Sequence, residues 1–362
     1  MILVVGAGIA GLSCALALEP FGDVLVVERR SAVAANAGAG IQLSPNAVKA
    51  LTAIGARDAV DAVAQRPKHL TIKSAGRRRA TVQVPYASME AQFGAPYLTV
   101  SRAALHRALL GEVARRPRIA LRFDTVVQHL RGEGAGWRAD GVDEAADFAV
   151  AADGVGSAVR GALLGDAPQE SSHVAWRGTM PRSTTAGTEL MLASGCHLVR
   201  YALPDARDNL VFIARRQLQH PADLRQHPMG GYLEGCLSWT PWPIQTRRHR
   251  FGAGSLALVG DASHAMPPFL AQGGAMALED AAVLGAAVAE HGRTPDASSF
   301  YASVRAPRTR RLATQTTRQG TIYHLPMPAS WARDAVMARL GPEGIFRRVS
   351  WIYRWDPPPR KA

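Results

Sequence analysis

The chain opens with MILVVGAGIAGLSCALALEPFGDVLVVE, residues 1–28, and this stretch decides the fold. Residues 2–5 are an apolar run typical of a buried strand. A glycine-rich turn follows at residues 6–11, and residues 12–22 predict a helix that ends at a glycine. Residues 24–28 then predict a second strand, so the stretch has the strand, turn, helix and strand order of a dinucleotide-binding unit.

The three glycines of this turn have the spacing G-x-G-x-x-G, and each has a separate physical reason. Gly6 allows the tight turn, Gly8 lets a pyrophosphate approach the backbone, and Gly11 lets the helix pack closely on the strand. The amide groups at the start of the helix face the phosphates. Glu28 ends the second strand, where its carboxylate can accept hydrogen bonds from ribose hydroxyls. An ordinary glycine-rich turn is the alternative, and Glu28 at the right distance argues against it.

Two later stretches carry a carboxylate at the end of an apolar run. ADGVGSAVR, residues 152–160, places Asp153 in an Asp-Gly turn before a helical run. GDASHAMPPFLAQGGAMALEDA, residues 260–281, places Asp261 directly after the strand-like SLALVG. Ligands of open α/β sheets bind at the carboxyl ends of the strands, so both acids are candidates for a cofactor site. Taken singly, each acid could equally be a turn or cap residue.

Composition restricts the class of protein. A hydrophobic fraction of 47% in 362 residues supports a well-developed core, and no apolar run is long enough for a transmembrane helix. Cys14, Cys196 and Cys236 show neither paired nor metal-ligand spacing, and the histidines show no metal motif, so we expect no metal site and a reduced, cytoplasmic setting. The formal net charge of +13 comes from scattered basic residues without interleaved aromatics, which favours a field that attracts small anions over nucleic-acid binding.

The motifs occur in a characteristic order along nearly the whole chain. GAGIAGL with Glu28, YLTVSRAALHRALL at 97–110, ADGVGSAVR and GDASHAMPPFLAQGGAMALEDA together resemble the single-component FAD-dependent aromatic hydroxylases. GAGIQLSPNAVKALTAIG at 38–55, VAWRGT, HLVRY, TIYHLP and SWIYRWDP are similar to their salicylate-hydroxylase-like branch, which shares the para-hydroxybenzoate-hydroxylase fold. The resemblance implies an α/β fold with a Rossmann-like FAD-binding domain, an inserted β-sheet substrate domain and a C-terminal helical region.

The resemblance also implies roles for the cofactor residues. Glu28 is expected to bind the adenosine ribose, Arg102 to lie along the FAD pyrophosphate, and Asp261 to bind the ribityl chain. Asp153 belongs to a motif linked to both FAD and NAD(P)H, and Pro268 to Gly274 are expected to border the flavin ring. Gly273 and Gly274 leave free amide groups at the start of a predicted helix over 275–290, where they can stabilise the anionic pyrimidine end of reduced flavin. Nothing in the sequence indicates a covalent tether, so the FAD is expected to be noncovalent.

On the substrate side the resemblance points to His197, Tyr201 and Gln272. His197 and Tyr201 are four residues apart in a predicted strand, which places both on one face. The implied reaction uses NADH or NADPH and O2, proceeds through a flavin C4a-hydroperoxide, and hydroxylates a small phenolic, aromatic-acid or N-heterocyclic ring. His197 is the candidate base for a phenol, because an imidazole titrates near neutral pH, and Tyr201 can orient the substrate or relay its proton. An exposed strand histidine and a packed sheet tyrosine are the alternatives.

The order of the motifs predicts a discontinuous domain organisation. The FAD-binding domain is expected at 1–72, 97–172 and 251–290, the substrate domain at 73–96 and 173–250, and the C-terminal helical region at 291–362, with a long helix interrupted or started near Pro307. The segment 216–250 is short for this branch, so the sequence does not determine the identity of the substrate. An epoxidase or a reductase of the same fold, and a non-catalytic flavin-binding or nucleic-acid-binding protein, are the alternative functions. A monomer or a homodimer would suit the sequence equally.

Overall fold

The computed structural model describes residues 1–31, 40–77, 79–134, 136–182, 187–216, 220–221, 224, 226–236 and 238–359. Parts of two stretches discussed above therefore lie outside the described residues. These are the first two positions of 38–55 and several positions of the short segment 216–250.

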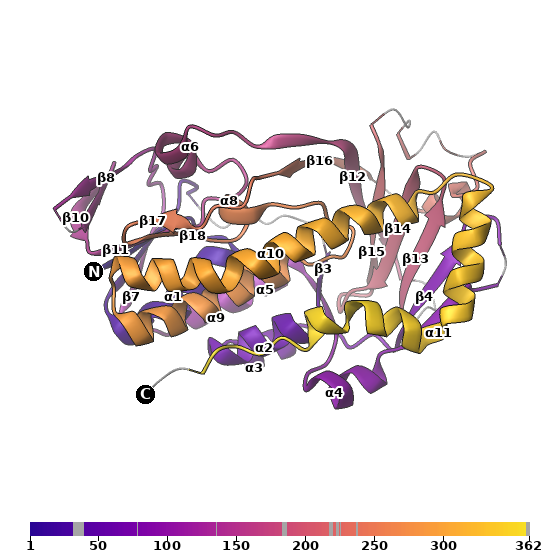
Figure 1. Ribbon diagram of the computed structural model, residues 1–362, viewed down its shortest axis with the longest axis horizontal. Helices are drawn as coiled ribbons and strands as arrows, with labels where there is room; N and C mark the ends of the chain where they lie inside the picture. Colours follow the sequence, from indigo (N-terminus) through magenta and orange to yellow (C-terminus); the bar gives the residue numbers. More distant parts are fainter. Residues whose placement is uncertain are drawn as a thin grey trace.

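A six-stranded sheet forms the end of the molecule that contains the N-terminus (Figure 1). Its order is β17-β18-β11-β1-β2-β7, and all neighbours are parallel except β17 and β18. The strands are β1 (Ile2–Val5), β2 (Val24–Val27), β7 (Ile119–Arg122), β11 (Phe148–Ala151), β17 (Gly252–Ala253) and β18 (Leu256–Leu258). The strands β1, β2, β11 and β18 are buried throughout, as continuous apolar runs in a covered parallel sheet should be.

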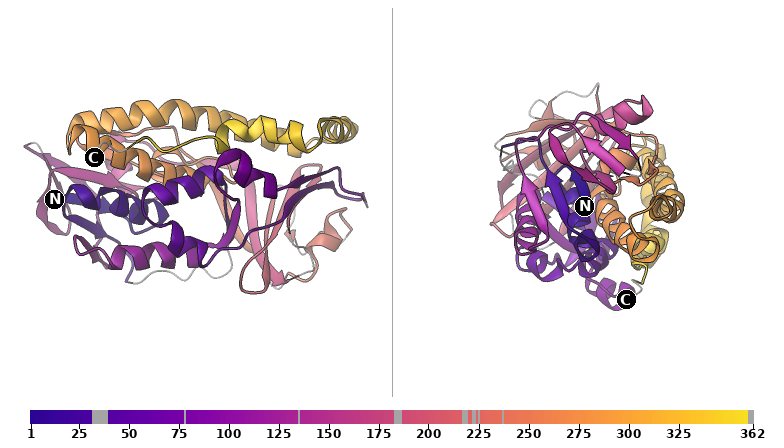
Figure 2. Two further views of the ribbon diagram at one scale, coloured as in Figure 1. Left: turned by 90° about the horizontal axis from the view of Figure 1, so that it is seen from below. Right: turned by 90° about the vertical axis from the view of Figure 1, so that its left-hand side faces the viewer.

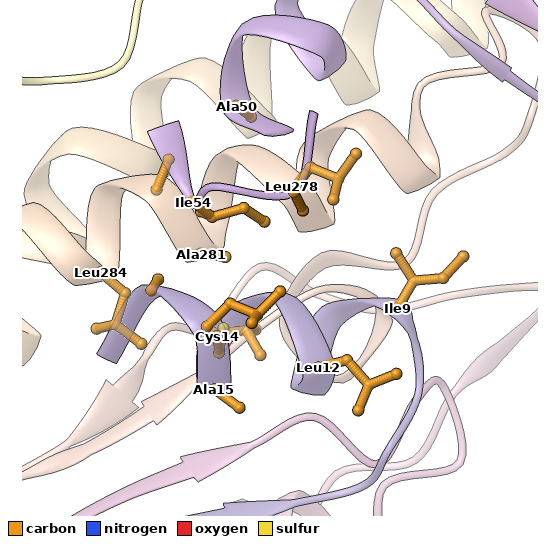
Figure 3. Close-up of a cluster of buried hydrophobic side chains, with 14 of the residues drawn as sticks. Ile9, Leu12, Cys14, Ala15, Ala50, Ile54, Leu278, Ala281 and Leu284 are labelled. Carbon is orange, nitrogen blue, oxygen red and sulfur yellow. The ribbon is translucent and has the colours of Figure 1, made fainter. Parts of the chain in front are cut away.

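Helices α1 (Ile9–Leu18) and α9 (Gly273–His291) pack against each other, and α2 (Pro45–Ala53) packs on α9 (Figure 3). In Figure 3 Cys14 of α1 lies toward Ala281 of α9. Helix α9 is buried without interruption from Ala275 to Val288. Its many alanines let the neighbouring helices approach closely, which is why an almost uniformly apolar helix is stable here.

The second sheet has seven strands in the order β16-β12-β15-β14-β13-β4-β5. The strands are β4 (His69–Ser74), β5 (Val82–Pro85), β12 (Gln169–Pro181), β13 (Thr188–Ala193), β14 (Cys196–Ala202), β15 (Arg207–Arg215) and β16 (Thr240–Thr246). All neighbours are antiparallel except β13 and β4. The predicted fold class, a Rossmann-like unit with an inserted sheet and C-terminal helices, is confirmed.

Two long helices close the chain on one side of both sheets (Figure 2). Helix α10 (Pro295–Tyr323) runs from the six-stranded sheet toward the seven-stranded one, and α11 (Ala329–Tyr353) turns back along the latter. The predicted interruption of α10 at Pro307 is wrong, because the helix continues through this residue. Buried contacts from Arg305 and Thr309 hold the turn on either side of it. Helix α11 has a break at Gly341, whose φ is 59°, immediately before Pro342.

The remaining elements connect these layers. They are β3 (Gly40–Leu43) paired with β6 (Leu98–Ser101), the hairpins of β8 (Leu130–Glu133), β9 (Gly136–Ala139) and β10 (Val142–Ala146), and the helices α3 (Arg57–Asp61), α4 (Ala87–Phe93), α5 (Arg102–Ala114), α6 (Ala158–Leu164), α7 (Gly230–Leu233), α8 (Asp261–His264) and the 3₁₀ turn η1 (Glu19–Phe21). Within the described residues, no helix has the length and apolar character needed to cross a membrane.

Candidate active site

The three glycines after β1 have three different surroundings. Gly6 has φ 105°, and a Cβ there would lie 2.6 Å from the carbonyl oxygen of Ala152 on the neighbouring strand end. At Gly11 a Cβ would overlap the carbonyl oxygen of Gly6, so only glycine lets α1 approach the turn. If Gly8 carried a Cβ, no other atom would lie within 4 Å of it, so a phosphate has room to approach the backbone here. The turn therefore fits a pyrophosphate.

The carboxylate of Glu28 lies at the edge of this turn. Its Oε2 accepts a hydrogen bond from the backbone N–H of Ala7 at 3.0 Å, and its Oε1 accepts one from the N–H of Arg30 at 3.2 Å. These bonds fix the carboxylate at the carboxyl end of β2, where a ribose would lie. Arg102 begins α5 and lines the same side of the cavity described below.

Asp153 lies in the turn between β11 and α6 and does not line the cavity, although its neighbours Ala152, Gly154 and Val155 do. Its Oδ2 accepts a weak hydrogen bond from the N–H of Val159 at 3.3 Å. Its Oδ1 is buried and has no partner among the described residues, and burial raises its pKa. In this structure the carboxylate thus supports the turn that borders the cavity.

Asp261 is exposed on the first turn of α8 and lines the cavity. A buried network below it holds this short helix in place. His264, at the other end of α8, contacts Oδ2 of Asp280 at 2.6 Å, and the N–H of Gly260 donates to the same oxygen at 2.8 Å. Burial opposes ionisation of Asp280, but His264 and Arg305 outweigh it and lower its pKa to about 2. The two ends of the segment 260–281 are thus bound to each other through Asp280.

Two buried arginines join the motifs together, and the sequence analysis predicted a role for neither. Arg305 of α10 pairs with Glu279 at 2.5 Å and with Asp280 at 2.7 Å, and none of the three side chains is exposed. Arg160, from the motif at 152–160, donates to the carbonyl oxygens of Ala262 and Ser263 and pairs with Asp166. Multiply hydrogen-bonded charges of this kind are strong only when every partner is present, so these contacts fix the cavity wall.

The start of α9 faces the cavity through glycine. Gly273 lines the cavity and has nothing within 4 Å of the place of a Cβ, so its backbone is open to a ligand. Gly274 is tighter, since a Cβ there would lie 2.5 Å from Cδ1 of Ile41. The preceding loop, with Pro268 and Phe269, also lines the cavity. A helix N-terminus without side chains in front of it can stabilise negative charge on a ring.

Gln272, the residue before this helix, does not face the cavity. Its side chain is 4% exposed, donates to Oγ of Ser44 at 3.0 Å and accepts from Nδ2 of Asn46 at 3.1 Å. Asn46 in turn donates to Glu279 at 2.7 Å. In this structure Gln272 ties the start of α9 to α2, while the loop beside it borders the cavity.

A cavity of about 1200 Å³ joins the two sheets. On the side of the six-stranded sheet Gly8, Arg102, Asp261 and Gly273 line it. On the side of the seven-stranded sheet the lining residues include Leu190, Val199, Tyr201, Val211 and Ile213, and α11 adds Met337, Phe346 and Val349. The cavity therefore has a polar end with free backbone and an apolar end with aromatic side chains, as a site for a dinucleotide and an aromatic molecule requires.

His197 and Tyr201 lie on one face of β14, together with Val199. Tyr201 lines the cavity, and its ring packs against Gly40, where a Cβ would lie 2.6 Å from the hydroxyl oxygen. Burial raises the pKa of Tyr201, and Arg177 partly offsets this. His197 is 1% exposed and does not line the cavity, although it contacts the rings of Phe269 and Tyr323, which do.

Two further features of the site were missed at the sequence level. Arg177, inside the quoted motif VAWRGT, lines the cavity with its guanidinium 4.5 Å above the ring of Trp242. His324, inside TIYHLP, lies 2.8 Å from His197 through Nε2 and Nδ1. Both residues lie in motifs on which the resemblance was based. The signals that could have identified them were therefore the cationic side chain of Arg177 and the titratable side chain of His324 within those motifs.

Comparison with known proteins agrees with this geometry. A family model described as "FAD binding domain" matches residues 1–217 and 233–316. The chain is 29% identical to 3-hydroxybenzoate 6-hydroxylase of Klebsiella oxytoca, over 98% of this chain and 96% of that protein. It is 32% identical to 3-amino-4-hydroxybenzoate 2-monooxygenase of Streptomyces cremeus, over 97% and 94%. The crystal structure of Klebsiella pneumoniae HpxO with FAD and uric acid superposes with a TM-score of 0.87 at 25% identity, covering 98% of this chain and 96% of that one.

The fold and the site define an FAD-binding oxidoreductase. The chain belongs to the FAD-binding-domain family of FAD-dependent monooxygenases, and FAD is its cofactor. The predicted resemblance is therefore confirmed.

Proposed function

We propose that this chain hydroxylates a small aromatic ring, with NADH or NADPH as reductant and O2 as the source of oxygen. The observation that carries the proposal is the continuity of the cavity from Gly8 and Asp261 to Tyr201 on the seven-stranded sheet. An aromatic molecule at the apolar end can thus approach a flavin ring at the start of α9. Hydroxybenzoates and aminohydroxybenzoates, which the names of the relatives specify, are the first substrates to test.

The cofactor residues have distinct tasks in this proposal. The turn at Gly8 and the cation of Arg102 hold the pyrophosphate, Glu28 holds the adenosine ribose, and Asp261 holds the ribityl chain. The open backbone at Gly273 lies beside the flavin ring, where the N-terminus of α9 stabilises negative charge. When bound and reduced, FAD supplies the activation of O2 and an electrophilic oxygen atom.

The chain's own residues prepare the substrate. A phenol attacks an electrophile far more readily as a phenolate, so a proton must leave its hydroxyl group. His197, which lies behind the cavity-lining rings of Phe269 and Tyr323, is our candidate for the base, because burial and two neighbouring histidines lower its pKa and keep it neutral. Tyr201 orients the ring, and the apolar residues around Val199 exclude water. Arg177 and Arg102 both line the cavity, which favours aromatic acids over neutral rings.

The test is a substrate screen with the FAD-loaded protein. Hydroxybenzoates, aminohydroxybenzoates and hydroxylated N-heterocycles are each added with NADH or NADPH, and we expect at least one to stimulate consumption of the reductant. The product should carry one additional oxygen atom derived from isotopically labelled O2. Stimulated consumption that yields only hydrogen peroxide, or an epoxide from an alkene, would contradict hydroxylation and indicate another flavin enzyme of the same fold.

A further inference from the structure

The cavity follows two straight rows of side chains across the seven-stranded sheet. In the first row the residues that pair directly from strand to strand are Arg177, Val211, Val199, Leu190 and Ile72. In the second row they are Tyr201, Thr188, Leu70 and Val84. All of these residues line the cavity, which therefore extends over the sheet from β12 to β5.

The first row is longer than a hydroxybenzoate. Neighbouring strands lie about 4.8 Å apart, so the four spacings between Arg177 and Ile72 amount to about 19 Å. A single aromatic ring with a carboxylate spans about two such spacings. With its carboxylate at Arg177, such a molecule reaches Val199 and stops before Leu190. The far half of the row is left for another group.

We call the part of the cavity beyond Val199 the apolar arm. Its walls include Leu70, Ile72, Val84 and Leu190 of the sheet and Met337 and Phe346 of α11. These side chains belong to one hydrophobic cluster, and protein interiors are otherwise packed as densely as organic crystals. A hollow within such a cluster that is continuous with a binding site is therefore room for a ligand.

The polar groups of the apolar arm are neutral, paired or exposed. Burial raises the pKa of Tyr97 and Tyr353, so their hydroxyl groups stay protonated. The buried guanidinium of Arg333 is paired with Asp334 at 2.9 Å. Arg348, which also lines the cavity, is exposed to solvent. The arm therefore suits an apolar group, and an acidic group belongs at the other end of the row.

The apolar arm reaches the surface beside α11. Ala329, Ala332 and Val336 line the cavity and are exposed, and their spacing of three and four residues places them on one face of the helix. Two of the three are alanines, which leave the most room at this mouth. A group longer than the arm can thus extend into solvent here.

We propose that the substrate is an aromatic acid with an apolar substituent, an alkyl chain or a second ring, and that the apolar arm binds this substituent. The carboxylate pairs with Arg177, and the ring lies against Val199 and Tyr201. The substituent extends over Leu190 and Ile72 toward α11. This inference rests on the proposed function and deepens it by naming the substrate class. The hydroxybenzoates in the names of the relatives would fill only the near half of the row.

The test measures binding to the oxidised, FAD-loaded protein through the change in flavin absorbance, so it requires no turnover. The probes are 3-hydroxybenzoate and its 4-alkyl derivatives from methyl to hexyl, in which the chain lies para to the carboxylate. We expect the dissociation constant to fall by about fourfold per methylene, the value for a buried CH2 group, until the chain reaches the mouth at Val336. A dissociation constant that does not fall with chain length would overturn the proposal.

Two variants test where the chain lies, and the readout is the dependence of the dissociation constant on chain length. Leu190→Phe fills the arm beside Val199 and should abolish this dependence. Ala332→Phe, at the exposed mouth, should end the gain at a shorter chain, and it replaces the first variant if that one loses FAD. Ala338→Phe is the matched control, since Ala338 is exposed on the same helix but does not line the cavity. A dependence that is unchanged in both Leu190→Phe and Ala332→Phe would place the chain elsewhere and overturn the arm.

The same probes with NADH or NADPH and O2 separate this inference from the proposed function. Chain-dependent binding without an oxygenated product would support the arm and contradict hydroxylation. Product from the unsubstituted ring, together with binding that ignores chain length, would support hydroxylation and overturn the arm. A second copy of the chain seated at the mouth would make probe binding weaken as the protein concentration rises, and this result would also overturn the assignment.

Discussion

The dinucleotide-binding half and the sheet half of the cavity are built in different ways. At the first, backbone groups and a few polar side chains come from short contiguous motifs, as at Gly6, Gly8 and Gly11. At the second, the groups are side chains that meet from distant parts of the chain, as where His197 of β14 meets His324, the residue directly after α10. A site made of backbone depends on local geometry, whereas a site made of side chains depends on the packing of whole elements.

The difference predicts opposite responses to mutation. Damage to a contiguous motif should remove FAD or the fold and leave little to measure. Damage to the sheet half should leave FAD in place and alter what happens to the substrate. Each variant below tests one side of this comparison.

The largest effects are expected within the glycine turn, and they separate folding from binding. Gly11→Val should prevent folding, because even a Cβ overlaps the carbonyl oxygen of Gly6. Gly8→Val should leave the fold intact, since the position is open, but should abolish FAD retention by filling the space of a phosphate. Circular dichroism and flavin absorbance of the purified variants distinguish the two results. A folded, FAD-loaded Gly8→Val protein would show that the turn does not hold the pyrophosphate.

His197→Ala should have the next largest effect. It should slow the reaction of the substrate without affecting the binding of FAD. With a phenolic substrate below its pKa, hydroxylation should slow by roughly 10²-fold, the usual scale for a lost base. Reduction of FAD by NAD(P)H should change little, because hydride transfer needs no base on the sheet. The product formed per NAD(P)H consumed should fall and hydrogen peroxide should rise. His249→Ala is the control, and an unchanged ratio and rate in His197→Ala would exclude this residue from the mechanism.

What could be predicted from the sequence follows the same division. The glycine turn, Glu28 and the strand before Asp261 were recognisable because each depends on neighbours within a few residues. The alternation of β14 placed His197 and Tyr201 on one face, but nothing local pointed to His324, which is 127 residues away. Arg160 and Arg305 were missed for the same reason, since their partners lie on other motifs. The continuation of α10 through Pro307 was also out of reach, because packing against α9 overrides the local preference.

The lowered pKa values of the buried histidines should also make the free energy of unfolding depend on pH. The pKa of His324 is about 3 in the folded protein and about 6.5 when the chain is unfolded, so the unfolded chain binds the extra proton. Stability should therefore be complete above about pH 6.5 and fall as the pH decreases toward 3. Each such group contributes about 1.4 kcal/mol per pH unit, or about 2 kcal/mol between pH 6.5 and 5.

The measurement is the urea midpoint at saturating FAD across this range. His324→Gln removes the titrating group, so its stability should depend less steeply on pH than that of the unmodified protein. His129→Gln, on the surface beside Asp140, should keep the full slope. Equal slopes for His324→Gln and the unmodified protein would mean that the ring is not held neutral by its surroundings.

The smallest effect is expected from Asp261→Ala, and it tests whether the dinucleotide half depends on side chains as well as on backbone. Asp261 is exposed at the cavity, and α8 is held from below by His264 and Asp280, so the variant should fold normally. Loss of a hydrogen bond from a charged carboxylate to the ribityl chain should weaken FAD binding by about tenfold, or about 1.4 kcal/mol. Fluorescence titration of the apoprotein with FAD measures this, with Asp296→Ala on the exposed first turn of α10 as the control. Unchanged affinity would mean that Asp261 does not reach the cofactor and that backbone contacts alone hold it. A loss of FAD as complete as that expected for Gly8→Val would make this side chain as important as the glycine turn. The contrast between the two halves of the cavity would then disappear.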